Sequence, residues 1–136
     1  MTKPGKHRIL VVDDEPTVCK SIRRVLVRED CEVDMALSGE DALSKEAEQP
    51  YDVMIVDLMM PGLSGMDLLK LLKARNSKAR IIMVTGYPTM RNTLQSMQLG
   101  AMDFLPKPFL PTTLRSLVAA ALEAGDDKPE GSGAAG

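Results

Sequence analysis

The sequence predicts an α/β fold, a doubly wound parallel sheet built from five consecutive βα units. Short apolar runs alternate five times with segments whose apolar residues recur at the helical period. Three of those runs are continuous and rich in β-branched residues, as expected of strands that are covered on both faces. Such an alternation implies right-handed crossovers and helices on both sides of the sheet. The flavodoxin-like strand order 2-1-3-4-5 is one common solution at this length.

The five predicted strands follow the apolar runs. The continuous runs are residues 9–12, 53–56 and 81–84. The runs at 33–36 and 102–105 each contain an aspartate, which a strand at the edge of a sheet tolerates better than a central one. We therefore expect these two strands at the edges.

Turn and cap signals divide the intervening segments into five helices. Pro16 suits the first turn of a helix, and Ser38 is a plausible N-cap three residues before Asp41. Thr89 opens the fourth helix, and Gly100 closes it as a C-cap. Pro111 opens the fifth. The third helix is predicted from its apolar stripe of Met66, Leu68, Leu69 and Leu72.

The 136 residues are enough for one buried core and too few for two ordinary domains. We place the folded domain at residues 7–124. Residues 1–6 are polar and are expected to form a flexible N-terminal tail. Residues 125–136 are rich in glycine and polar residues, which indicates a flexible tail or an interdomain linker.

Composition excludes several classes of protein. The formal net charge is −2 and the basic residues are scattered, so we expect no direct binding of nucleic acid. Cys19 and Cys31 form neither a disulfide framework nor a metal-ligand pattern. No apolar run approaches the ~20 residues that span a bilayer, and the N-terminus lacks a signal peptide. We expect a cytoplasmic protein that does not contact membranes.

Three acidic residues end strands that are neighbours in the expected order. Asp13 and Asp14 follow the first strand, and Asp57 ends the third. In an open parallel sheet, ligands bind beyond the carboxyl ends of the strands, at the point where strand order reverses. Three converging carboxylates repel one another unless a cation offsets their charge. Mg²⁺, which binds few protein oxygens and retains several waters, is the expected occupant.

A structural explanation competes with this one, because an aspartate at a strand end is often a cap or turn residue. Asp14 or Glu15 could simply cap the helix that begins at Pro16. Thr85 and Lys107, however, end the fourth and fifth strands. A hydroxyl and an ammonium beside three carboxylates indicate a site for a phosphoryl group as well as a metal.

This combination of residues resembles the receiver domain of two-component response regulators. The resemblance rests on Asp13-Asp14, Asp57, Thr85 and Lys107-Pro108 in a (βα)5 pattern, and it covers about residues 7–124. Residues 60–66 are similar to the Pro-Gly-x-x-Gly loop that follows the phosphorylated aspartate in that family. We interpret the glycines of this loop, Gly62 and Gly65, as turn formers.

The resemblance implies a role for each acidic residue. Asp57 would be the nucleophile that takes a phosphoryl group from the phosphohistidine of a sensor histidine kinase or a phosphotransfer protein. Asp14, Asp57 and the backbone carbonyl of Met59 would bind Mg²⁺ directly, and Asp13 would act mostly through a bound water. The chain would be a signalling domain that accepts phosphate, and we do not expect it to be an enzyme.

The remaining residues of the resemblance connect the site to a surface. Lys107 would hold a phosphoryl oxygen, and the peptide bond between Lys107 and Pro108 is expected to be cis. Thr85 would hydrogen-bond another phosphoryl oxygen, and Phe104 would then change rotamer. These changes would alter the face made by the fourth helix, fifth strand and fifth helix. A homodimer could form through that face, and the output remains open between a stand-alone relay and a receiver within a longer regulator.

Two positions beside the phosphoryl group are expected to tune its hydrolysis. Met59 and Tyr87 are two residues beyond Asp57 and Thr85. The thioether of Met59 cannot orient a water as an amide or a carboxylate would, and both side chains are bulky enough to shield the phosphorus. We therefore predict slow autodephosphorylation.

Two other functions and a methionine binding surface are less consistent with the same residues. A Mg²⁺-dependent phosphatase commonly has a second acid where this chain has Met59. A flavin carrier needs a phosphate loop rich in Ser, Thr and Gly where this chain has Asp-Asp-Glu-Pro. The ten methionines could indicate a binding surface, but most of them fall on expected core positions.

Overall fold

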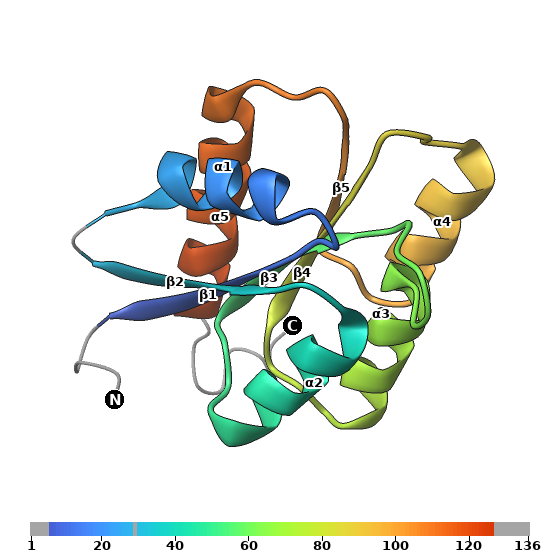
Figure 1. Cartoon of the computed structure of the whole chain (residues 1–136), viewed down its shortest axis with the longest axis horizontal. Coiled ribbons are helices and arrows are strands. Elements are labelled where there is room, and N and C mark those ends of the chain that lie inside the picture. The colour runs from blue at the N-terminus through green and yellow to red at the C-terminus, as the bar shows by residue number, and fades with distance from the viewer. Residues whose placement is uncertain (1–5, 29, 127–136) are drawn as a thin grey trace, which may run out of the picture.

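The structure, a computed structural model, describes residues 6–28 and 30–126 and confirms the predicted α/β class. Its five strands form one parallel sheet in the order β2-β1-β3-β4-β5, with β2 and β5 at the edges as expected (Figure 1). The strands are β1 (His7–Val12), β2 (Cys31–Ala36), β3 (Val53–Asp57), β4 (Arg80–Thr85) and β5 (Asp103–Pro106). The helices are α1 (Pro16–Leu26), α2 (Gly39–Glu48), α3 (Gly65–Ala74), α4 (Met90–Gln98) and α5 (Pro111–Asp126).

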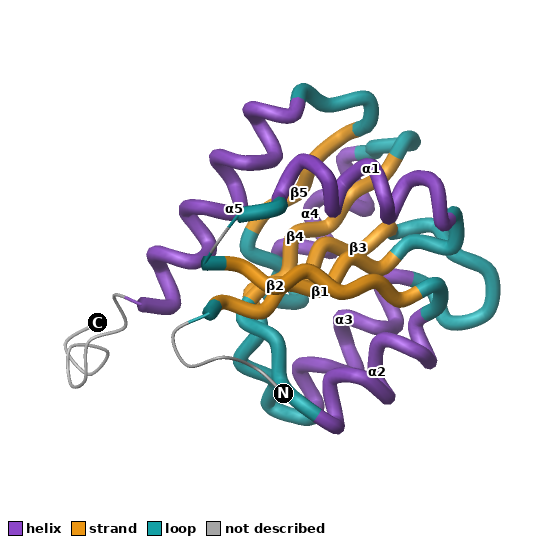
Figure 2. The backbone as a smooth tube through the Cα atoms, turned by 60° about the vertical axis from the view of Figure 1, so that its left-hand side comes forward, coloured by secondary structure: helices purple, strands orange, loops and turns teal. Residues whose placement is uncertain are grey.

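The core consists of two apolar layers, one on each side of the sheet. Helices α1 and α5 cover one face, and Figures 1 and 2 show α2 and α3 on the other. Alternate residues of the central strands enter the two layers, so Leu10 and Met54 face α2 and α3 while Ile9 and Ile55 face α1 and α5. A sheet that is buried on both faces explains why these strands read as continuous apolar runs.

The observed elements extend beyond some of the predicted boundaries. Strand β2 begins at Cys31, two residues before the predicted run, because Cys31 and Glu32 pair with the first residues of β1. Helix α5 continues to Asp126, two residues beyond the end of the domain predicted at residues 7–124. Of the two predicted tails, residues 1–5 and 127–136 lie outside the described residues.

The helix caps agree with the sequence signals. The Ser38 hydroxyl accepts the backbone N–H of Asp41 at 3.0 Å and caps α2. Helix α4 begins with a capping box, in which Thr89 and Asn92 each accept the other's backbone N–H. Gly100 follows the end of α4 with a φ of 105°, the left-handed conformation that a helix-terminating glycine supplies.

Helix α4 is the least buried helix, which the sequence did not indicate. Ser96 is its one buried residue. Met90 and Met97 are 80% and 43% exposed, so these two methionines do not occupy core positions, whereas Met54 and Met83 do. Within residues 6–28 and 30–126, no helix is both long and apolar enough to cross a membrane.

Candidate functional site

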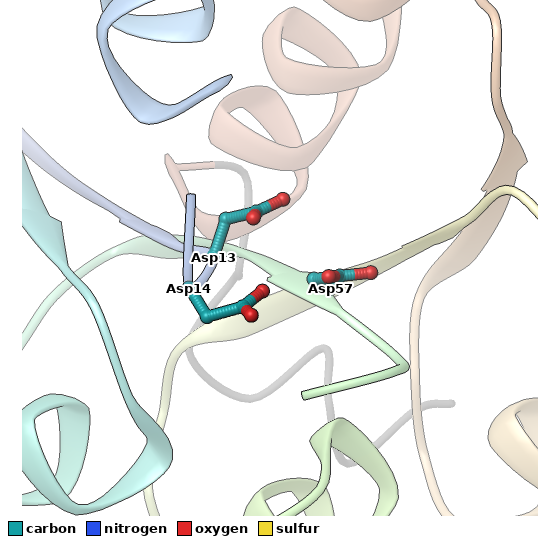
Figure 3. A group of neighbouring side chains, drawn as sticks. All are labelled: Asp13, Asp14 and Asp57. Carbon is teal, nitrogen blue, oxygen red and sulfur yellow. The ribbon is translucent and has the colours of Figure 1, made fainter. Parts of the chain in front are cut away.

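The order of the strands brings the three aspartates together. Strand β1 lies beside β3, with Val12 paired to Val56, so the residues that follow Val12 lie next to Asp57. One carboxylate oxygen from each of Asp13, Asp14 and Asp57 lies within 4.8 Å of the other two. Figure 3 shows the three side chains at the ends of the two strands, with their carboxylates on the same side. The prediction of an acidic cluster is therefore confirmed.

The three carboxylates differ in their surroundings. Asp13 and Asp57 are buried, and Asp14 is exposed. Asp13 is held in place because one of its oxygens accepts the backbone N–H of Glu15 at 2.9 Å. Glu15 is the N-cap of α1, yet its side chain makes no capping hydrogen bond. Helix capping by Asp14 or Glu15 therefore does not account for the cluster.

Lys107 lies beside the acidic cluster. Its ammonium nitrogen is 3.3 Å from a carboxylate oxygen of Asp13 and 3.9 Å from one of Asp57. The backbone N–H of Lys107 donates to the carbonyl of Thr85 at 2.7 Å, which fixes the end of β5 against the end of β4. The peptide bond between Lys107 and Pro108 is cis, as expected. The ammonium of Lys107 thus faces Asp13 and Asp57, two of the three carboxylates.

The electrostatics of the cluster favour a bound cation. The pKa of Asp57 is raised to about 6, chiefly by burial and also by the Asp13 and Asp14 charges, against the opposing effects of Lys107 and of the backbone N–H of Met59. A raised pKa means that ionised Asp57 is short of compensating positive charge. Mg²⁺ prefers carboxylate oxygens, so the donor set fits this ion. The backbone of Met59 is adjacent, since its N–H donates to Asp57 at 3.4 Å.

Thr85 and Phe104 lie on the same side of the sheet, and Thr85 is the nearer of the two to the cluster. Asp57 pairs with Val84, so Thr85 ends the strand next to Asp57. Its side chain is fully buried, and its hydroxyl accepts the backbone N–H of Tyr87 at 3.1 Å. Phe104 pairs with Met83 and is half-buried against the core layer under α3. Thr85 and Phe104 thus lie on neighbouring strands, and their roles in a switch stay a prediction.

Two residues that we expect to tune hydrolysis form the rim of the site. Met59 is 57% exposed and Tyr87 is 76% exposed. Each lies in the loop that follows its strand, two residues beyond Asp57 or Thr85. Met59 thus gives the rim an apolar side chain, and Tyr87 gives it an aromatic one.

Gly65, which we predicted to be a turn former, has a further role in positioning the site. Gly65 is buried at the first position of α3, and a Cβ there would overlap the carbonyl oxygen of Asp57 and lie 2.8 Å from the Cα of Leu58. Its N–H donates to the carbonyl of Leu58 at 3.0 Å. Gly65 is thus a close-packing residue beneath the site, whereas Gly62, with a φ of 72°, is the turn former that we expected.

Cys19 supports the loop that carries Asp13. Its thiol is buried, lies 3.4 Å from the carbonyl oxygen of Asp13 and donates to it. Burial, and secondarily the Asp13 charge, raises the pKa of Cys19 to about 11, so the thiol stays protonated and unreactive. Its role here is packing.

A groove of about 660 Å³ adjoins the site. It runs between α1 and the loop from β5 to α5 and is lined by Val18, Val25, Phe109 and other residues. Lys107 belongs both to the groove and to the acidic cluster. The groove therefore opens directly beside Asp57.

Comparison with known proteins gives a consistent family. The family described as "Response regulator receiver domain" matches residues 9–119. The chain is 35% identical over 111 residues to the transcriptional regulatory protein ResD of Bacillus subtilis, which covers 82% of this chain and 46% of ResD. It is 34% identical over 124 residues to the DNA-binding response regulator MtrA of Mycolicibacterium smegmatis, and this match covers 91% of this chain and 54% of MtrA. The chain spans about half the length of these curated relatives or less.

Two solved structures with the same fold are each matched over almost their whole length. A CheY-like receiver domain protein from Methanospirillum hungatei has a TM-score of 0.84 and 29% identity, over 91% of this chain and 99% of that one. The chemotaxis protein CheY4 of Vibrio cholerae has a TM-score of 0.80 and 28% identity, with 86% and 99% covered.

Proposed function

The chain belongs to the response regulator receiver domain family, the signalling domains of two-component systems, and we propose that its own activity is the Mg²⁺-dependent acceptance of a phosphoryl group on Asp57. The observation that carries the proposal is the grouping of three carboxylates within 4.8 Å beside the ammonium of Lys107. Carboxylates alone would indicate only a cation site. The lysine and the buried Thr85 hydroxyl supply the partners that a phosphoryl group needs.

The proposed metal site uses the residues that the resemblance indicated. Asp14, Asp57 and the backbone carbonyl of Met59 would hold Mg²⁺ directly, and Asp13 would act through a water. The raised pKa of Asp57 supports this assignment, because a divalent charge would offset the repulsion among the carboxylates. When bound, the ion neutralises charge on the transferred phosphoryl group.

Asp57 carries out the transfer in this proposal. Its carboxylate oxygen attacks the phosphorus of a phosphohistidine, a P–O bond forms as the P–N bond breaks, and the imidazole leaves with the electron pair of that bond. Lys107 moves from Asp13 and Asp57 to a phosphoryl oxygen and stabilises the spread negative charge. The donor is a sensor histidine kinase or a phosphotransfer protein.

The proposed switch begins at Thr85. Its hydroxyl would leave the N–H of Tyr87 and bind a phosphoryl oxygen, and the space it vacates would admit the ring of Phe104. Both side chains lie on the face of the sheet that α3 and α4 approach, which supports a direct steric link. The result is a population shift of the α4-β5-α5 face.

That face carries an apolar stripe suited to an interaction. Met90, Leu94 and Met97 follow helical spacing along α4 and are all more than 40% exposed. We propose that a second copy of the chain covers this stripe when Asp57 is phosphorylated. No direct role in nucleic-acid binding is assigned to this domain.

The proposed lifetime of the phosphoryl group is long. Met59 and Tyr87 occupy the two rim positions, and neither offers a carboxylate or an amide that could orient an attacking water. Hydrolysis would then depend on water positioned by the backbone alone.

The phosphoryl donor would contact the groove beside Lys107. A donor histidine must reach Asp57, so its protein necessarily covers the rim of the site. The groove between α1 and the loop after β5 offers half-buried apolar side chains there, among them Val18 and Phe109. A helix with apolar residues on one face is the partner that this shape fits.

One experiment tests the central proposal. The 136-residue chain is incubated with Mg²⁺ and acetyl phosphate, and its intact mass is compared with that of Asp57→Ala. The expected result is an acid-labile phosphoryl adduct on the parent only, lost when EDTA removes the metal. No adduct on the parent, or an equal adduct on Asp57→Ala, would show that Asp57 is not the acceptor. Sedimentation with beryllofluoride reports dimer formation separately.

A further inference from the structure

A separate cavity lies at the end of the sheet opposite Asp57, where the strands begin. Its volume is about 630 Å³. The start of β4, the loop before β3, the loop after α4 and the last turns of α5 contribute to its wall. Figure 2 shows the end of α5 at this edge of the sheet, far from the loops that carry the aspartates. Nothing in the proposed phosphoryl chemistry uses this cavity.

The charges that line the cavity are mainly positive. Lys73, Lys78 and Arg80 contribute three cations, and Asp52 is the one carboxylate among the lining residues. Asp52 already accepts the backbone N–H of Arg8 at 2.7 Å. Within the part of the chain that the structure describes, neither side-chain ammonium, of Lys73 or of Lys78, has an ion-pair or hydrogen-bond partner. The cavity therefore has an excess of unpaired positive charge.

Arg80 has an unused hydrogen-bond donor in this wall. One of its terminal nitrogens donates to the carbonyl of Ala124 at 3.2 Å, which ties the start of β4 to the last turn of α5. Its Nε is buried and has no hydrogen-bond partner among the described residues. A buried donor without a partner is costly, so this end of β4 is held in place at some expense in stability.

Lys73 is held against the wall by its contact with Gly100. A Cβ at Gly100 would lie 2.7 Å from Cε of Lys73 and 3.3 Å from its ammonium nitrogen. The stem of the lysine thus runs along the glycine backbone, and both residues line the cavity. Lys73 is exposed, so its ammonium is accessible to a ligand in the cavity.

The shape and the lining indicate the class of ligand. Cavities of roughly 300–1,000 Å³ hold small molecules. Met102, Ala121 and Leu122 give one part of the wall an apolar surface, while the cations provide for two or more negative charges. We propose that this cavity binds a small organic anion with several negative charges, either a phosphate monoester or a polycarboxylate. Such a ligand would join the loop before β4 to the end of α5.

Isothermal titration of the full 136-residue chain tests this inference, with EDTA present so that no metal occupies the acidic cluster. The probes are citrate, adenosine monophosphate and inorganic phosphate. Saturable binding of citrate or adenosine monophosphate, tighter than that of inorganic phosphate, is expected. The organic probe that binds more tightly shows whether the ligand is a polycarboxylate or a phosphate monoester. Absence of saturable binding by both organic probes would overturn the inference.

Variants locate the binding site. Lys73→Gln and Lys78→Gln should each weaken binding about tenfold, since each removes one charged partner. Lys20→Gln, which alters an exposed lysine on α1 that does not line the cavity, is the matched control and should change nothing. Asp57→Asn should also leave anion binding unchanged. Equal losses in Lys20→Gln and Lys73→Gln would mean only nonspecific attraction to surface charge, and the proposed site would be wrong.

Discussion

Gly65 lies directly beneath Asp57, so close that a Cβ at this glycine would overlap the carbonyl oxygen of Asp57. The neighbouring atoms are backbone, which cannot move aside as a flexible side chain would. Gly65→Ala should therefore displace the loop that carries Asp57, destabilise the fold by about 1–3 kcal/mol and slow phosphorylation by acetyl phosphate.

The measurements for Gly65→Ala are urea denaturation and the rate of adduct formation by intact mass. Gly125→Ala is the control, because nothing lies within 4 Å of a Cβ at that position. If Gly65→Ala has the stability and the phosphorylation rate of the parent, the close packing has no part in positioning Asp57.

The pKa of Asp57 predicts an unusual dependence of stability on pH in the metal-free protein. Because the folded-state pKa is raised from 3.8 to about 6, the folded state binds more protons than the unfolded state between these values. The free energy of unfolding therefore falls as the pH rises through this range. At pH 7.5 without Mg²⁺, Asp57→Asn should be more stable than the parent by roughly 1–2 kcal/mol, after allowance for solvent screening.

The advantage of Asp57→Asn should disappear near pH 4, where the parent is also neutral at Asp57. Mg²⁺ should reverse the order at pH 7.5, because it stabilises the parent more than the variant. Urea denaturation at both pH values, with and without Mg²⁺, measures these differences. An Asp57→Asn variant that is less stable than the parent at pH 7.5 in EDTA would contradict the raised pKa.

The rim residues predict the lifetime of the phosphoryl group. Met59→Asn and Tyr87→Glu together should accelerate its loss about tenfold, equivalent to about 1.4 kcal/mol of activation free energy, because both new side chains can orient water. Loss is followed by intact mass after the donor is removed. Met59→Leu with Tyr87→Phe keeps the apolar character and is the matched control. Unchanged hydrolysis in the polar variant would show that these positions do not limit it.

The groove predicts a difference between phosphoryl donors. Phe109→Asp should reduce transfer from a phosphohistidine protein by tenfold or more, since a buried apolar contact of about 1.4 kcal/mol or more is lost. Transfer from acetyl phosphate, which needs no docking surface, should stay the same. Leu110→Asp, which alters an exposed apolar residue outside the groove lining, is the control. An equal loss with both donors would mean that the substitution damages the site itself.

The position of Thr85 predicts a variant that is phosphorylated but does not switch. Thr85→Ala removes the hydroxyl without touching the carboxylates or Lys107, so the adduct on Asp57 should still form. The change at Phe104 should be lost, which ¹⁹F NMR of fluorophenylalanine at residues 104 and 109 would detect. Thr93→Ala, on α4, is the control. A normal change at Phe104 in phosphorylated Thr85→Ala would remove Thr85 from the switch.

Much of this arrangement could be predicted from the sequence, for reasons that apply to particular residues. Asp34 and Asp103 marked the two edge strands because a central strand covered on both faces leaves little room for a charge. The proximity of Asp13 and Asp57 could be predicted because the carboxyl ends of neighbouring parallel strands meet at one edge. The helix caps followed from local chemistry alone.

Other features depend on the path of the chain in space. The tight contact of Gly65 arises only when the loop after β3 returns beneath Asp57, and no local pattern distinguishes it from the turn at Gly62. The exposure of Met90 and Met97 was missed because composition cannot say which helix lacks a covering neighbour. The basic cavity combines Lys73, Lys78 and Arg80 with the distant end of α5, and only the closed fold brings them together.

The capping box of α4 has a mechanical consequence. Thr89 and Asn92 satisfy the first backbone donors of this helix from within its own sequence, and Ser96 alone is buried. The beginning of the helix is therefore fixed by its own residues, while its attachment to the sheet is slight. It can tilt or slide as one preformed element, so that Met90 and Leu94 move together. The molecule can report a change at Asp57 by reorienting a preformed element, with no cost of melting and refolding it.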